Sequence, residues 1–287
     1  MKQIILSLII LISGVSSWAT DKVVYGDDNR QDLYEVQNPL FKTLARSTAA
    51  MIENGKLHYK GDIVKLYAQT LREYGVCAGE RFTEQLTAAN CSGFLVAEDI
   101  LVTAGHCIKE YSDCGNYSWV FDFAENGEKS EIRELSANSI YRCVEVIKQE
   151  LNTFSKNDYA IIKLDRKVTD REPLKFRTQG TIEVGTPLVV IGHPTGLPTK
   201  VADGAQVRTV KDIYFVSNLD TFGGNSGSAV FNAETGEVEG ILVRGERDYK
   251  YNNIHSCYTP NYCTNDGCRG EDSTLITNLN LLNIISN

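Results

Sequence analysis

Three short segments carry residues that could together perform acyl-transfer chemistry. They hold His106, Asp158 and Ser226, and they cover residues 103–107, 157–164 and 223–230. A serine hydroxyl attacks a carbonyl well only when an imidazole takes its proton, and that imidazole needs a carboxylate to fix its tautomer and stabilise its charged form. Glycines beside Ser226 let backbone N–H groups approach the negative charge that develops on the attacked oxygen. The segments therefore contain every group that a hydrolytic serine requires.

The segments read Thr-Ala-Gly-His-Cys, Asn-Asp-Tyr-Ala-Ile-Ile-Lys-Leu and Gly-Gly-Asn-Ser-Gly-Ser-Ala-Val, in that order. From about residue 91 to 245 they resemble the chymotrypsin-like serine peptidases, and most of all the bacterial branch with the V8-type glutamyl endopeptidases. The resemblance implies that Ser226 is the nucleophile, His106 the general base and Asp158 the residue that orients the imidazole. It also implies an oxyanion hole formed by the N–H groups of Gly224 and Ser226, with no metal ion and no cofactor.

The same resemblance identifies residues that contact the substrate side chain preceding the scissile bond. These substrate-binding residues are Asp220, Thr221, Val243, Arg244 and Gly245. In the family the floor of this pocket lies six residues before the nucleophile, which is Asp220. A carboxylate at that position favours cleavage after Arg or Lys.

Two alternatives to this preference stay open. Thr221 matches the glutamyl-specific branch, and Arg244 could neutralise Asp220 or itself attract an acidic residue. The glutamyl alternative is weakened because the pocket histidine of that branch falls at Leu242. Asp220 could also point away from the substrate and only hydrogen-bond its own loop. We predict cleavage after Arg or Lys.

The N-terminal residues have the pattern of a secretory signal peptide. Lys2 supplies a positive charge, residues 4–15 are nearly all apolar, and Ser17 and Ala19 are small residues at the two positions that a signal peptidase inspects. The apolar run is shorter than the roughly 20 residues of a membrane-spanning helix. We expect a signal peptide over 1–19 and a secreted protein, extracellular or periplasmic.

The net charge of the chain excludes some classes of binding partner. The formal net charge of −8 argues against nucleic acid or an anionic membrane. We expect a monomer that acts on protein or peptide substrates. One serine peptidase domain should cover 20–287, with a first barrel over about 20–170 and a second barrel and C-terminal helix over about 171–287.

Eight cysteines in an exported chain favour disulfides over free thiols or metal. The resemblance implies a bridge between Cys91 and Cys107 across the histidine loop. Six cysteines then allow 15 pairings, and they are Cys77, Cys114, Cys143, Cys257, Cys263 and Cys268. The last three lack the paired Cys-x-x-Cys spacing of a zinc site, so we expect a disulfide-bonded loop there.

Short strands must position these residues. Segments rich in β-branched and aromatic residues predict strands at 93–96, 100–102, 118–121, 160–162, 187–191, 214–216 and 240–243. With the resemblance they predict an all-β fold of two antiparallel six-stranded β-barrels of the chymotrypsin type, and a cleft between the barrels that unites His106 and Asp158 with Ser226.

Two helices are expected beside the barrels. Apolar side chains recur at helical spacing between Asp62 and Gly75, at Ile63, Tyr67, Leu71 and Tyr74, which predicts an inserted helix over 62–74. A C-terminal helix is predicted by Leu275, Ile276, Leu279, Leu282 and Ile285.

Two other classes of protein compete with a serine endopeptidase. A non-catalytic binding protein on the same fold would usually show a replaced catalytic residue, and none is replaced here. An α/β-hydrolase acting on esters would carry its serine first and its histidine last, which is the reverse of the order seen.

Overall fold

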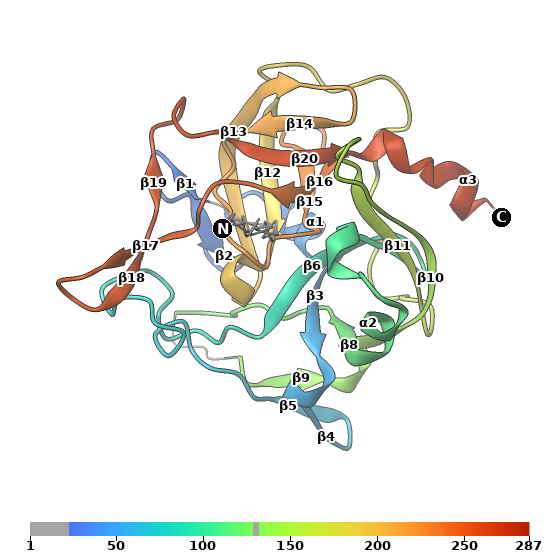
Figure 1. Cartoon of the computed structure of the whole chain (residues 1–287). Helices are drawn as coiled ribbons and strands as arrows, with labels where there is room; N and C mark the ends of the chain where they lie inside the picture. The colour runs from blue at the N-terminus through green and yellow to red at the C-terminus, as the bar shows by residue number, and fades with distance from the viewer. Residues whose placement is uncertain (1–22, 129–131, 287) are drawn as a thin grey trace, which may run out of the picture.

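Strands dominate the computed structural model, which describes residues 23–128 and 132–286. The expected signal peptide at 1–19 lies outside these residues. Figure 1 shows two barrels, one above the other, with the C-terminal helix at the side. The predicted all-β fold of two six-stranded antiparallel barrels is confirmed.

The first barrel is closed by six strands. In order around the barrel they are β10 (Ile140–Leu151), β11 (Asp158–Leu164), β7 (Ile100–Thr103), β6 (Ala89–Ala97), β3 (Thr48–Glu53) and β8 (Tyr117–Val120). Strand β7 is buried throughout, and β11 is buried except at Lys163. Their Val, Ile and Leu residues suit such two-sided burial, because branched side chains pack well on a pleated surface.

The second barrel is also a ring of six strands, closed by the pairing of β12 with β13. Its strands are β12 (Pro187–Gly192), β15 (Ala229–Asn232), β16 (Val238–Arg244), β20 (Glu271–Leu275), β14 (Tyr214–Ser217) and β13 (Lys200–Val210). One hydrophobic core cluster extends from the first barrel into the second and includes Trp119 and Phe231. The shared core holds the two barrels against each other.

The N-terminal strands belong with the second barrel. Strand β2 (Arg30–Asp32) pairs with β13, and β1 (Val24–Tyr25) pairs with β19 (Tyr262–Cys263). The first barrel was expected to start at about residue 20, but it begins at β3. Tyr25 and Asn29, from this N-terminal part of the chain, donate backbone hydrogen bonds to Asp220.

Smaller elements surround the barrels. They are the sheet β4 (Leu57–Lys60), β5 (Ile63–Leu66) and β9 (Glu134–Ser136), the hairpin β17 (Tyr249–Asn252) and β18 (Cys257–Pro260), and the helices α1 (Pro39–Ala45), α2 (Tyr111–Asn116) and α3 (Leu281–Ile285). Among residues 23–128 and 132–286, no helix is long and apolar enough to cross a membrane.

The predicted inserted helix over 62–74 is wrong. Residues Ile63–Leu66 form β5, in which Val64 and Leu66 are buried while Ile63 and Lys65 are exposed. This period of two is the pattern of a strand with one buried face. Tyr67 and Tyr74, which completed the helical spacing, are exposed to 58% and 50%. Pairing with β4 and β9 therefore makes residues 63–66 a strand and not part of a helix.

The C-terminal helix is present but shorter than expected. Leu275 is the last residue of β20, and a 3₁₀ turn covers Ile276–Leu279. Asn280 then has a φ of 53°, which separates this turn from α3. Ile276, Leu279 and Leu281 are buried against the shared core.

Candidate active site

Neighbouring strands of the first barrel bring His106 and Asp158 together. His106 lies in the 3₁₀ turn Gly105–Cys107 that follows β7, and Asp158 is the first residue of β11. Because β7 and β11 pair side by side, the end of one strand lies next to the start of the other. The site therefore begins with a contact that the barrel topology imposes.

Two hydrogen bonds join the histidine to the aspartate. The His106 Nδ1 and Asp158 Oδ2 atoms are 2.9 Å apart, and the His106 backbone N–H donates to Asp158 Oδ1 over 3.0 Å. Asp158 is only 1% exposed, so water does not weaken the contact. A carboxylate at Nδ1 favours the tautomer that carries its proton there, which leaves Nε2 without a proton.

Gly105 allows the histidine turn to approach the barrel closely. A Cβ at this position would overlap the carbonyl oxygen of Glu150 and would lie 2.9 Å from the backbone nitrogen of Tyr159. Any side chain here would push the turn, and His106 with it, away from β10 and β11.

Ser226 comes from the second barrel, in the turn just before β15. Its carbonyl oxygen accepts a hydrogen bond from the Ser92 N–H over 2.8 Å and lies 3.7 Å from the sulfur of Cys107. Cys107 directly follows His106 in the chain. The structure thus places Ser226 at the junction of the barrels, beside the histidine turn.

Ser92 connects the two barrels at this junction by hydrogen bonds, although its sequence context did not predict such a role. Its hydroxyl donates to the Gly224 carbonyl over 2.8 Å and accepts from the His193 N–H over 3.0 Å. It is fully buried. The only available signal was its position next to Cys91, which does not distinguish it from any other strand serine.

The backbone hydrogen bond of Gly223 fixes the direction of the Gly224 N–H group. Gly224 has a φ of 90°, and the preceding carbonyl, of Gly223, accepts the Thr195 N–H over 2.5 Å. The C=O and N–H of one trans peptide point in opposite directions. The Gly224 N–H therefore points away from Thr195.

Gly227 offers a test of how closely the two barrels meet at the serine turn. Its φ is 87°, and a Cβ would overlap the Ser92 carbonyl oxygen and the Thr103 hydroxyl. We expect Gly227→Ala to lower the free energy of unfolding by about 3 kcal/mol or more, because strain and overpacking add. Denaturant unfolding measures this.

Gly61 is the matched control for that variant. It has a φ of 64°, but no atom lies within 4 Å of the place that a Cβ would take, so only backbone strain applies. Gly61→Ala should cost only about 1–2 kcal/mol. Equal losses in the two variants would contradict close packing at Gly227.

All eight cysteines form disulfides. The pairs are Cys77–Cys257, Cys91–Cys107, Cys114–Cys143 and Cys263–Cys268. The Cys91–Cys107 bond ties the histidine turn to β6, and Cys263–Cys268 closes a short loop. His106 lies close to both sulfurs of Cys91 and Cys107, but sulfurs joined in a disulfide do not serve as thiolate ligands.

Removal of the Cys91–Cys107 bridge should reduce both stability and activity. For the double variant Cys91→Ala/Cys107→Ala we expect a loss of about 3 kcal/mol in unfolding free energy, from the freed loop of the unfolded chain. Turnover should fall as well, because the turn of His106 loses its tie to β6. Unfolding in denaturant and peptide hydrolysis are the measurements. A stability change under about 1 kcal/mol would contradict the prediction.

The Asp220 carboxylate accepts hydrogen bonds from the N-terminal segment. Its two carboxylate oxygens accept the backbone N–H groups of Tyr25 over 2.7 Å and Asn29 over 2.8 Å. Burial raises the pKa of the Asp220 carboxyl to about 7, against the opposing effect of these two donors. The alternative in which Asp220 hydrogen-bonds its own loop differs from this geometry, because both backbone donors belong to the N-terminal segment.

Arg244 is not directed at Asp220, in contrast to the neutralising role considered from the sequence. Its guanidinium lies 3.6 Å from Asp158 Oδ2 and 3.3 Å from Asp272 Oδ2, and it donates to the Lys156 carbonyl. The positive charge therefore faces the carboxylate that binds His106. Val243 is fully buried in the shared core, so its side chain presents no surface to a substrate.

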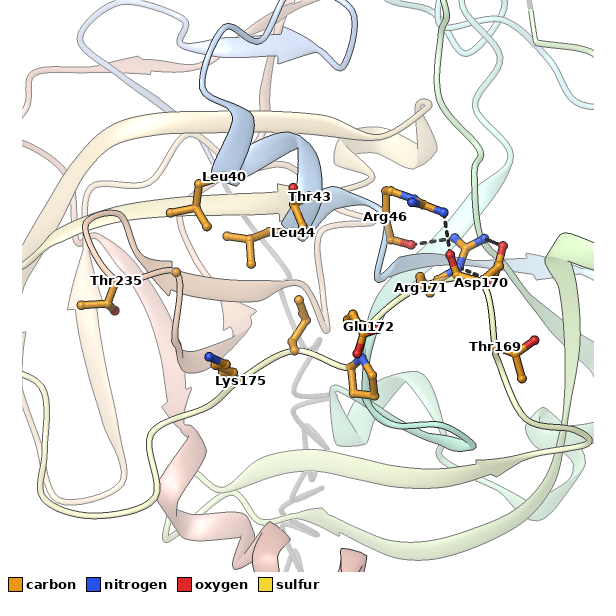
Figure 2. Close-up of a pocket in the computed structure, with 13 residues that line it drawn as sticks. Leu40, Thr43, Leu44, Arg46, Thr169, Asp170, Arg171, Glu172, Lys175 and Thr235 are labelled. Carbon is orange, nitrogen blue, oxygen red and sulfur yellow. Dashed lines mark hydrogen bonds and ion pairs between the residues drawn. The ribbon is translucent and has the colours of Figure 1, made fainter.

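A separate cavity of about 470 Å³ lies between α1 and the connection of the two barrels. Figure 2 shows Leu40 and Leu44 at one end and the Arg46, Asp170 and Arg171 network at the other. None of His106, Asp158 and Ser226 lines it. The cavity is therefore not part of the candidate active site.

Comparison with known proteins identifies the class. The family model of the trypsin-like peptidase domain matches residues 91–241, more than half of the chain. The chain belongs to this family of peptidases, and the family expected from the sequence is confirmed.

Solved structures agree on the fold. A Glu endopeptidase has a TM-score of 0.54 and 20% identity, covering 92% of this chain and 100% of its own. The VesB protease of Vibrio cholerae has a TM-score of 0.53 and 13% identity, covering 90% of this chain and 66% of its own. Comparison with curated protein sequences finds no significant match.

Proposed function

We propose that this peptidase is a secreted serine endopeptidase that uses Ser226, His106 and Asp158 and cleaves after Arg or Lys. The observation that carries the proposal is the pair of hydrogen bonds from His106 to the buried Asp158. The sulfur of the next residue, Cys107, lies 3.7 Å from the Ser226 carbonyl oxygen, which accepts the N–H of Ser92 on β6. A histidine held in this way by a carboxylate is the requirement for a serine to act as nucleophile.

The chemistry would proceed in two steps. The Ser226 oxygen adds to the carbonyl carbon of the scissile bond while its proton passes to His106 Nε2, and His106 then gives that proton to the leaving amine as the C–N bond breaks. A water molecule, deprotonated by His106, attacks the resulting ester and restores the Ser226 hydroxyl. The N–H groups of Gly224 and Ser226 stabilise the charged oxygen in both steps.

Secretion is supported by the disulfides. Four bonds that use all eight cysteines suit an oxidising compartment. Sequencing of the N-terminus of the exported protein tests the proposed signal peptide, and a start soon after Ala19 is expected.

Labelling and substrate profiling test the proposed chemistry. A fluorophosphonate probe should label Ser226 in the wild-type protein and not in Ser226→Ala. A peptide library should then show cleavage after Arg or Lys. Cleavage after Glu or Asp would favour the glutamyl alternative, although Leu242, at the position of that branch's histidine, is fully buried in the apolar core. Absence of both labelling and turnover would favour the non-catalytic binding protein.

A further inference from the structure

A second carboxylate reaches the predicted substrate pocket from a strand whose sequence carried no functional signal. Glu271 is the first residue of β20, and it is fully buried. The Thr221 hydroxyl donates to its Oε2 atom over 2.6 Å, and the Glu246 N–H donates to Oε1 over 3.2 Å. Thr221 lies in the loop between β14 and β15 that carries Ser226, so Glu271 contacts the segment that holds the candidate nucleophile.

Gly245 shows where this carboxylate lies relative to the pocket wall. A Cβ at Gly245 would overlap both oxygens of the Glu271 carboxylate. The carboxylate therefore fills the space that a side chain of residue 245 would occupy. Gly245 and Thr221 are two of the residues assigned to the pocket, and Glu271 bridges them.

Asp220, the carboxylate expected in this role, is held differently. Both of its oxygens accept backbone N–H groups, from Tyr25 and Asn29. Its lone pairs are thus directed at the N-terminal segment, which covers it. Glu271 accepts hydrogen bonds from Thr221, from the Glu246 backbone and, over 3.4 Å, from the Tyr25 hydroxyl. These donors orient the carboxylate.

We propose that Glu271, and not Asp220, is the specificity-determining residue that accepts the positive charge of a substrate Arg or Lys. The substrate side chain extends along the face of Gly245 and ends at the Glu271 carboxylate, which Thr221 holds in place. A guanidinium or ammonium paired with a carboxylate makes the stronger class of hydrogen bond. This inference rests on the proposed function, because it assigns the residue behind the proposed preference.

The test compares two isosteric variants, Glu271→Gln and Asp220→Asn. In Glu271→Gln we expect kcat/KM for peptides with Arg before the scissile bond to fall by on the order of 100-fold, because a buried charge loses its partner. Peptides with Leu or Phe there should change by less than about threefold. In Asp220→Asn the ratio of Arg to Leu peptides should stay within about threefold of wild type, whatever happens to stability.

Labelling by a fluorophosphonate distinguishes failure of this inference from failure of the proposed function. If the wild-type protein is not labelled at Ser226, the proposed function is wrong, and so is the inference that rests on it. If the wild type and Glu271→Gln are both labelled but the Arg preference survives in Glu271→Gln, only the inference is overturned. Loss of the preference in Asp220→Asn alone would return the role to Asp220.

A second variant covers the case in which Glu271→Gln does not fold. Thr221→Val keeps the charge and the volume but removes the hydroxyl that orients Oε2. We expect a fall of about tenfold for Arg peptides with little change for Leu peptides. Affinity for benzamidine, a small aromatic amidinium, should fall in parallel when it is measured by calorimetry on Ser226→Ala and on Ser226→Ala/Thr221→Val. Unchanged benzamidine affinity and unchanged Arg preference would overturn the proposal.

Discussion

Replacement of Ser226 by alanine is expected to lower peptide hydrolysis by at least about 10⁴-fold. The reason is that the variant lacks the proposed nucleophile, on the residue whose carbonyl oxygen accepts the Ser92 N–H beside Cys107. Hydrolysis of a fluorogenic peptide by purified protein measures the loss. Circular dichroism and the unfolding midpoint should be close to wild type, since a single hydroxyl is removed.

Ser228 provides the matched control for this variant. It lies two residues further along the same turn, it is fully buried, and its hydroxyl is 3.3 Å from Asn225 Oδ1. Ser228→Ala should keep probe labelling and most of the turnover. The double variant Ser226→Ala/His106→Ala should be little worse than Ser226→Ala, because the two residues act as a unit. Substantial turnover by Ser226→Ala would end the proposal of a serine peptidase.

Asp158→Asn is expected to reduce kcat by about 10⁴-fold at neutral pH. The carboxylate accepts hydrogen bonds from both the ring and the backbone N–H of His106. An asparagine that keeps the backbone contact through its oxygen turns its NH₂ group toward Nδ1, so Nδ1 must accept and the ring proton moves to Nε2. The imidazole then has no lone pair for the Ser226 proton. Steady-state kinetics give the size of the effect.

Asp272→Asn is the control for the loss of a buried carboxylate nearby. Asp272 accepts from Arg244 and Arg269 and is not bonded to His106. We expect less than a tenfold change in kcat, because the imidazole keeps its tautomer. A loss in Asp158→Asn that is no larger than the loss in Asp272→Asn would contradict the assigned role of Asp158.

Local sequence determined the strands and the set of chemical groups. The predicted strands fall within or overlap β6, β7, β8, β11, β12, β14 and β16, because β-branched and aromatic residues pack well on the pleated surface of a sheet. The segments with His106, Asp158 and Ser226 were recognisable for a similar reason. Each combines the reactive residue with the small or apolar neighbours that its own turn or strand requires.

Local pattern was insufficient where a neighbouring strand decides the structure. The spacing of Ile63, Tyr67 and Tyr74 matched a helix, but β5 is paired with β4 and β9, and these tyrosines face solvent. The C-terminal helix is also shorter than its apolar spacing predicts, because Asn280 has a left-handed backbone conformation just before α3. Such outcomes depend on partners that a window of sequence does not contain.

Side-chain partners across the barrels were decided only by the tertiary structure. Asp220 is bonded to Tyr25, 195 residues away, and Glu271 meets Tyr25 across 246 residues. Arg244, expected at the pocket, instead faces Asp158 and Asp272. The sequence determined which charged groups the chain possesses. Closure of the barrels determined which of them meet, because a buried charge takes the partner that the packed strands place beside it.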